Sequence, residues 1–242
     1  MCNIFRSLIL ADIKVIFYNS KLLISCMILL SVIILLTLFY PEISDYIFSN
    51  YGILTDNYYP LTALTLIALI PMLFGILYGF ILLNEIKESI SAGSKIAHAT
   101  RRNYMHIRII FVAALSFILV ITAIFFTNPV PDQGWLRTLF AALLFSVQSV
   151  FCLLFIGSLG KTKIFGLALS RVYWIFLIVL PLGLLLHHPW NYLAFFSPLY
   201  WVTWAWIVQS PVESLIYGSI AVIMTVSVAI MLYSRYINKQ TT

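Results

Sequence analysis

Long runs without a charged side chain decide what this chain can fold into. From Leu61 to Leu83, for example, no residue carries a charge. A run of this kind matches the hydrocarbon layer of a bilayer, which takes about 20 apolar residues per helix. Because a backbone inside lipid must satisfy its own hydrogen bonds, each such run predicts a transmembrane α-helix.

The composition excludes an ordinary soluble protein. Of the 242 residues, 62% are hydrophobic and 9% are charged, whereas about a quarter of the residues of a soluble domain are charged. The sequence therefore predicts an all-α polytopic membrane protein, a single transmembrane domain over 1–242 with no room for a separate soluble catalytic module. The predicted transmembrane helices are 22–40, 61–83, 109–127, 138–159, 164–186 and 215–234.

The first residues, 1–21, have a polar side. On a helical wheel about a third of the circumference contains Asn3, Arg6, Ser7, Lys14 and Lys21. We interpret 1–21 as a helix that lies in the cytoplasmic interface of the membrane with its basic side on the lipid headgroups. The alternative is that these residues are simply the start of the first span.

Residues 188–213 are apolar but broken. Their apolar part, 193–208, is short for a span, and it is interrupted by Ser197 and Pro198. It also contains three tryptophans, which favour the membrane boundary. We predict that 188–213 forms a re-entrant helical pair between the fifth and sixth spans, which enters from the outer face and buries its broken backbone against protein.

The basic residues favour six crossings over seven. With six crossings both termini are cytoplasmic, and Arg137 is the only one of the 14 lysines and arginines outside. A seventh crossing would place Arg235 and Lys239 outside, against the positive-inside rule. The net charge of +6 is then explained by contacts with anionic membrane lipid and with a partner, so it gives no indication of nucleic-acid binding.

The predicted spans offer little chemistry. Charged residues within transmembrane helices usually mark ion paths or catalytic groups, and the apolar cores of these spans contain none, only the polar Gln148. The sequence from Gly157 to Thr162 ends like a phosphate-binding loop, but Phe155 stands where the first glycine is needed. The cysteines and histidines show no metal-binding spacing. We therefore predict no catalytic residue, no metal site and no cofactor bound by this chain.

The polar interval 84–108 is the strongest candidate for binding a soluble partner. It carries seven of the chain's 22 charged side chains, and a protein held mostly in lipid must expose such a segment to water. Ile86 and Ile90 are four residues apart, so a short helix would present one apolar edge, and Gly93 can end that helix. The alternative is an ordinary solvated loop.

The order of these segments resembles the permease subunits of type 2 ABC exporters over nearly the whole chain. The most specific part is a Gly-Leu-Ala-Leu turn at 166–169, an apolar helix, and a Pro-Leu-Tyr-Trp step at 198–201. This part is similar to permeases for the export of fluoroquinolones and related drugs. The sequence also contains a small-xxx-small step from Gly75 to Gly79, which lets helices approach closely.

The resemblance implies how such a chain would be driven. It would form a multi-pass subunit in the bacterial inner membrane and would couple to two copies of a cytoplasmic ABC ATPase, which hold ATP and Mg. A second permease copy, or a sister permease, would enclose the substrate path with it. The residues of 84–108 that would contact the ATPase are Glu85, Lys87, Glu88, Ser89 and Ile90.

The sequence does not distinguish between several classes of substrate. A drug, a peptide, a lipid-linked precursor or haem would each suit an apolar path, and Gln148 is the candidate polar residue along it. The chain itself is predicted not to be an enzyme. Two alternative functions remain, a non-transporting membrane assembly protein and a lipid-modifying membrane enzyme.

Overall fold

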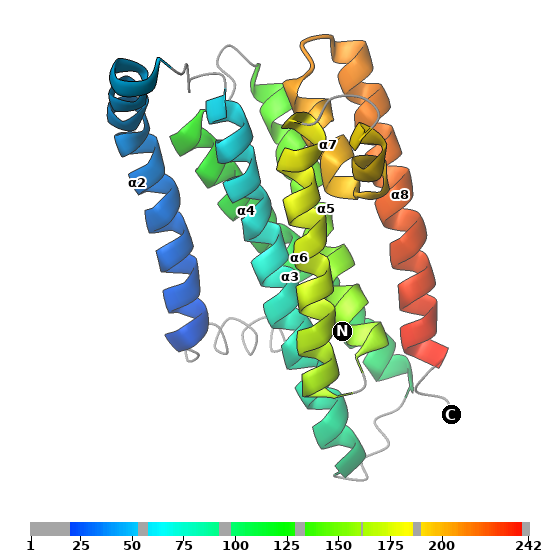
Figure 1. Ribbon diagram of the computed structural model, residues 1–242. Helices are drawn as coiled ribbons and strands as arrows, with labels where there is room; N and C mark the ends of the chain where they lie inside the picture. Colours follow the sequence, from blue (N-terminus) through cyan, green and yellow to red (C-terminus); the bar gives the residue numbers. More distant parts are fainter. Residues whose placement is uncertain are drawn as a thin grey trace.

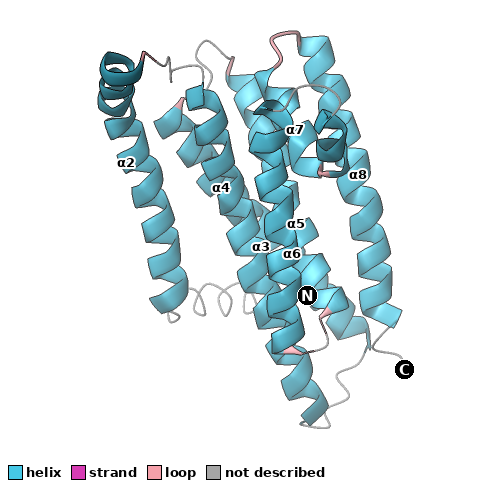
Figure 2. Ribbon diagram, viewed as in Figure 1, coloured by secondary structure: helices cyan, strands magenta, loops and turns pink. Residues whose placement is uncertain are grey.

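The computed structural model is a bundle of long helices that run in alternating directions (Figure 1). It describes residues 20–52, 58–91, 98–128, 134–160, 162–185 and 190–238. Within these ranges every regular element is a helix and no strand occurs (Figure 2). The elements are α2 (Ser20–Tyr51), α3 (Tyr59–Ser91), α4 (His98–Thr127), α5 (Trp135–Leu159), α6 (Lys163–Leu185), η2 (Trp190–Phe196), α7 (Pro198–Ile207) and α8 (Pro211–Asn238).

Six of these helices are long and apolar enough to cross a membrane, namely α2, α3, α4, α5, α6 and α8. The predicted all-α polytopic fold with six transmembrane helices is thus confirmed. The predicted interfacial helix 1–21 lies almost entirely outside the described residues. The bundle has two ends: the α7 end, at the top of Figure 1, and the Ser91 end, where α3 stops.

The first membrane helix is longer than predicted. The sequence predicts that it stops at Tyr40, but α2 continues through Pro41 to Tyr51. A proline inside a helix removes one backbone hydrogen bond, and helices of membrane proteins tolerate this loss. The helix ends where Gly52 takes a positive φ of 66° and its amide donates to the carbonyl of Phe48 at 2.9 Å, which is a common helix-ending geometry.

The polar interval 84–108 is mostly helical. Its first part continues α3 to Ser91, and its last part begins α4 at His98. Both ends are rich in residues that favour helices, such as Glu and Lys after Asn84. Residues 92–97 lie outside the described part of the chain.

Helix α5 forms the centre of the bundle. Among the described helices it packs against α3, α4, α6, α7 and α8, and its contact with α3 is the most extensive of these pairs. The main contacts of α2 in the described part of the chain are with α3 and α4, and it stands at one edge of the bundle (Figure 1). The core is therefore built around α5, and α2 is the most loosely attached of the long helices.

Two short helices complete the α7 end. Both η2 and α7 pack on α6, and α7 also packs on α5 and α8. The hydroxyl of Ser197 donates to the carbonyl of Phe176 at 3.3 Å, and the indole N–H of Trp201 donates to the carbonyl of Phe195 at 2.9 Å. The interruption between η2 and α7 at Ser197 thus packs against protein. The re-entrant course of 188–213 through a membrane stays a prediction.

Candidate functional site

Helix α3 extends beyond the length that a membrane requires. It has 33 residues, which at about 1.5 Å per residue is roughly 50 Å, whereas the hydrocarbon layer is about 30 Å thick. In Figure 1 its far end reaches below the other helices. The last two turns carry the predicted coupling residues Glu85, Lys87, Glu88, Ser89 and Ile90, for which the structure describes the helical backbone alone.

Glycines bring α3 and α5 into close contact. A Cβ atom added to Gly75 would lie 2.5 Å from the Cβ of Cys152 and 2.6 Å from the carbonyl oxygen of Ser149. One turn further along α3, a Cβ on Gly79 would lie 2.8 Å from the Cβ of Ile156. The small-xxx-small step is therefore confirmed as a packing face.

Toward the Ser91 end the roles of the two helices are reversed. Here α3 supplies the large side chains and its neighbours supply the glycines: a Cβ on Gly157 would lie 2.5 Å from Leu82, and a Cβ on Gly160 would lie 2.8 Å from Leu83. Gly166, in the first turn of α6, meets Leu83 at the same distance. Leu82 and Leu83 thus pack against glycines at the end of α5 and the start of α6. This contact fixes the position of α3 just before its last two turns.

Arg108 is buried and does not lie in a solvated loop. The charge count places it in the cytoplasmic polar interval 84–108, but it lies in α4 and is only 1% exposed. Burying an arginine is costly unless its charge finds partners within the protein, and Arg108 has an interaction partner there. Met105, one turn earlier in α4, is also 1% exposed. The buried part of α4 therefore begins before the predicted span 109–127.

Gln148 joins three helices inside the bundle. It is 2% exposed, and its side-chain N–H donates to the hydroxyl of Thr225 in α8 at 3.0 Å. The hydroxyl of Tyr173 in α6 donates to the backbone carbonyl of Gln148 at 3.4 Å. The side-chain oxygen Oε1 of Gln148 is buried without a hydrogen-bond partner. The structure therefore places this residue between α5, α6 and α8.

Arg137 joins the start of α5 to the end of α7. Its guanidinium donates to the carbonyl of Trp206 at 3.0 Å and to that of Gln209 at 3.1 Å. Carbonyl groups at the C-terminal end of a helix lack partners within the helix and attract cations. Arg137 is the one basic residue that the charge count places on the outer side of the membrane. Its guanidinium thus satisfies carbonyl groups at the C-terminal end of the short helix α7, a role that no local sequence signal indicates.

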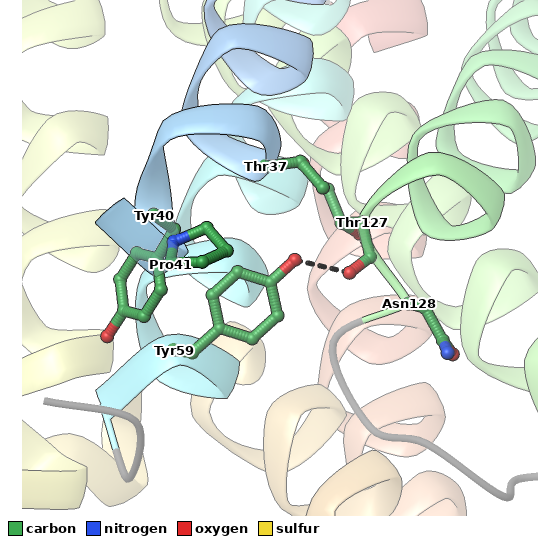
Figure 3. A pocket seen from close by; sticks show the side chains of 6 residues that line it. All are labelled: Thr37, Tyr40, Pro41, Tyr59, Thr127 and Asn128. Carbon is green, nitrogen blue, oxygen red and sulfur yellow. Dashed lines mark hydrogen bonds between the residues drawn. The ribbon is translucent and has the colours of Figure 1, made fainter. Parts of the chain in front are cut away.

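The described residues form two hollows of interest. One, of about 430 Å³, lies at the α7 end between α2, α3 and α4 (Figure 3). The other, of about 340 Å³, is an apolar groove between α4 and α8 with α5 as its floor, and His106 and Tyr233 are hydrogen-bonded at 3.0 Å at its margin. Within the described ranges, no three His, Cys, Asp or Glu residues are grouped so that they could hold a metal ion.

These features define a class of protein: a multi-pass, all-helical membrane protein with a buried core of tightly packed helices. Comparison with known families identifies the class further. Residues 12–233 match the family described as fluoroquinolones export permease protein Rv2686c-like, and the chain belongs to this family. No curated protein and no solved structure matches the chain. The family assignment confirms the resemblance to export permeases and identifies a transport-related membrane subunit.

Proposed function

We propose that this chain is the membrane-spanning subunit of an ATP-driven exporter, and that α3 passes the motion of a separate ATPase into the bundle. The observation that carries this proposal is the continuity of α3. One unbroken helix runs from Tyr59 to Ser91, and its last turns contain the charged sequence that follows Asn84. A helix end that extends past the membrane in this way offers a surface that a soluble partner can bind.

The packing of α3 supports the transfer of force. Interiors are close-packed and transmit displacement rather than absorb it. Gly75 and Gly79 bind α3 to α5 in the middle of the bundle, and Leu82 and Leu83 bind it to α5 and α6 near the Ser91 end. A push on the extension would therefore move α3, α5 and the start of α6 together, as expected for rigid-body switching.

The residues that we assign to the ATPase contact are Glu85, Lys87, Glu88, Ser89 and Ile90. Two ATPase subunits, which hold ATP and Mg, would bind to the extensions of two permease chains, either two copies of this chain or this chain and a sister permease. The location that suits this assembly is a bacterial inner membrane with both termini in the cytoplasm, as the positive-inside rule prefers.

The family description supports a choice of substrate class. It names the export of fluoroquinolones, and we propose that this chain transports drugs of this kind or compounds of similar chemistry. Gln148 is buried between helices of one chain, so its proposed contribution to the substrate path is to fix the packing of α5 against α8.

The test is co-purification with ATP hydrolysis as the readout. The chain would be co-expressed with ATPase subunits from its own operon, purified through a tag on the chain, and compared with the variant Glu85→Lys/Glu88→Lys. We expect an ATPase to co-purify, and we expect the double charge reversal to weaken its binding by at least about tenfold, since a close charge pair across an interface can contribute about 1.5 kcal/mol or more and about 1.4 kcal/mol corresponds to a tenfold change in affinity.

The matched control is Glu213→Lys, a charge reversal in the first turn of α8 at the α7 end. It should leave both co-purification and ATP hydrolysis unchanged. If no ATPase binds the chain, or if the double reversal behaves as the control does, the coupling assignment is wrong and a non-transporting assembly role becomes the better account.

A further inference from the structure

The larger hollow is a candidate ligand site at the α7 end of the bundle. In Figure 3 its walls come from three helices: the middle of α2, the first turn of α3 and the end of α4. Its volume of about 430 Å³ lies in the range of small-molecule pockets. The lining residues are Thr37, Tyr40, Pro41, Tyr59, Thr127 and Asn128.

Three hydroxyl groups of this pocket already donate their protons to backbone carbonyls. Thr37 donates to the carbonyl of Ile33 at 2.9 Å, and Thr127 donates to that of Ala123 at 2.9 Å. Tyr59 donates to the backbone carbonyl of Thr127 (Figure 3). A hydroxyl oxygen that has donated its proton retains lone pairs and can only accept. The three hydroxyls therefore suit a ligand that donates hydrogen bonds.

Two aromatic rings form another part of the wall. The ring centroids of Tyr40 and Tyr59 are 4.7 Å apart with an interplanar angle of 56°, so the rings pack on each other and no ligand fits between them. The face of a tyrosine ring carries negative partial charge and attracts cations. The rings thus offer both an apolar surface and a preference for positive charge.

The charged side chains described next to the pocket on α2 are acidic. Glu42 and Asp45 lie exposed just beyond the pocket-lining Pro41. The helix dipoles do not decide which ligand charge the pocket prefers, because α3 begins and α4 ends at this pocket and their partial charges oppose each other. The charged side chains decide this preference, and they favour a cation.

We propose that this pocket binds an aromatic ammonium ion. The aromatic part would lie on the rings of Tyr40 and Tyr59, and the charged N–H groups would donate to the hydroxyl oxygens of Thr37 and Tyr59. Binding is a property of this chain alone. Only the further step, that the bound cation is also an exported compound, rests on the proposed function.

The test measures direct binding to the purified chain in lipid nanodiscs, without any ATPase. The probe is 1-(1-naphthylmethyl)piperazine, which is fluorescent and whose secondary amine is protonated at mildly alkaline pH. Its N-acetylated form, whose remaining tertiary amine is largely unprotonated at that pH, is the neutral comparison. We expect saturable binding of the cation and binding of the neutral form at least about tenfold weaker, since a hydrogen bond that a charged group donates is stronger than one from a neutral group.

Three variants locate the site. Thr37→Val removes an acceptor while keeping the shape of the side chain, and Tyr40→Leu removes a ring face; each should weaken cation binding about tenfold or more. The matched control is Thr122→Val, because Thr122 makes the same kind of bond to its own helix, to the carbonyl of Ile118 at 2.8 Å, and does not line the pocket. It should bind as the unaltered chain does.

The proposal is overturned if the cation and its neutral form bind equally, or if Thr37→Val and Tyr40→Leu bind the cation as well as Thr122→Val does. Either result leaves the ATPase coupling untouched, because no ATPase is present in this measurement. Conversely, a chain that binds the cation but never an ATPase would retain this site and lose the proposed function.

Discussion

Gly75 of α3 and Cys152 of α5 lie against each other so closely that a Cβ on the glycine would be only 2.5 Å from the Cβ of the cysteine. Cys152 is a free thiol, and it is fully buried. The contact sets the distance between the two helices that form the most extensive pair in the bundle. Their separation is therefore decided by the absence of one side chain.

A first prediction concerns this contact. Gly75→Ala should lower the free energy of unfolding by about 1–3 kcal/mol, because an added methyl group in a close-packed interior forces its neighbours apart. Thermal unfolding of the purified protein in detergent measures the effect. Gly134→Ala is the control, since a Cβ there meets nothing within 4 Å. Equal unfolding temperatures for the two variants would contradict the prediction.

A second prediction concerns the end of α7. Arg137→Met keeps most of the length of the side chain but removes both hydrogen bonds to the carbonyls of Trp206 and Gln209. We expect a loss of about 1.5–3 kcal/mol and faster hydrogen exchange of the last turn of α7. Arg235→Gln replaces an exposed arginine near the end of α8 and should change neither measurement. Unchanged exchange in α7 would show that the two carbonyls do not depend on Arg137.

A third prediction concerns the buried amide of Gln148. Gln148→Met loses the hydrogen bond to Thr225 but also removes the unpartnered Oε1, and Thr225 keeps its bond to the carbonyl of Ala221. The net change in unfolding free energy should therefore be within about 1 kcal/mol. Gln148→Glu should cost several kcal/mol, because it places a carboxyl group where no charge partner compensates it. Thermal unfolding compares the two variants, and a larger loss for Gln148→Met than for Gln148→Glu would be the contrary result.

The sequence predicts the membrane helices well because uncharged runs have few other solutions. It misplaces their ends where polar residues continue a helix. Nothing in the apolar pattern shows that α2 passes Pro41 or that Arg108 is buried. These outcomes depend on which neighbour covers the helix, which is a property of packing rather than of local composition.

The two candidate sites differ in the same way. The coupling residues from Glu85 to Ile90 follow one another in the chain, so a charged segment after a span is enough to suggest them. The lining of the proposed cation pocket comes from three helices, and the bond from Tyr59 to Thr127 joins residues 68 positions apart. No pattern in the sequence relates these hydroxyl groups before the helices are packed.

The bonds of Arg137 also imply an order of events during biosynthesis. Its two acceptors, the carbonyls of Trp206 and Gln209, follow it by 69 and 72 residues. When a ribosome has just delivered α5 to the membrane, those carbonyls have not yet been made. Arg137 at the start of α5 can therefore form these two hydrogen bonds only after α6 and α7 have been made. The newly made chain completes this end of the bundle only late in its translation.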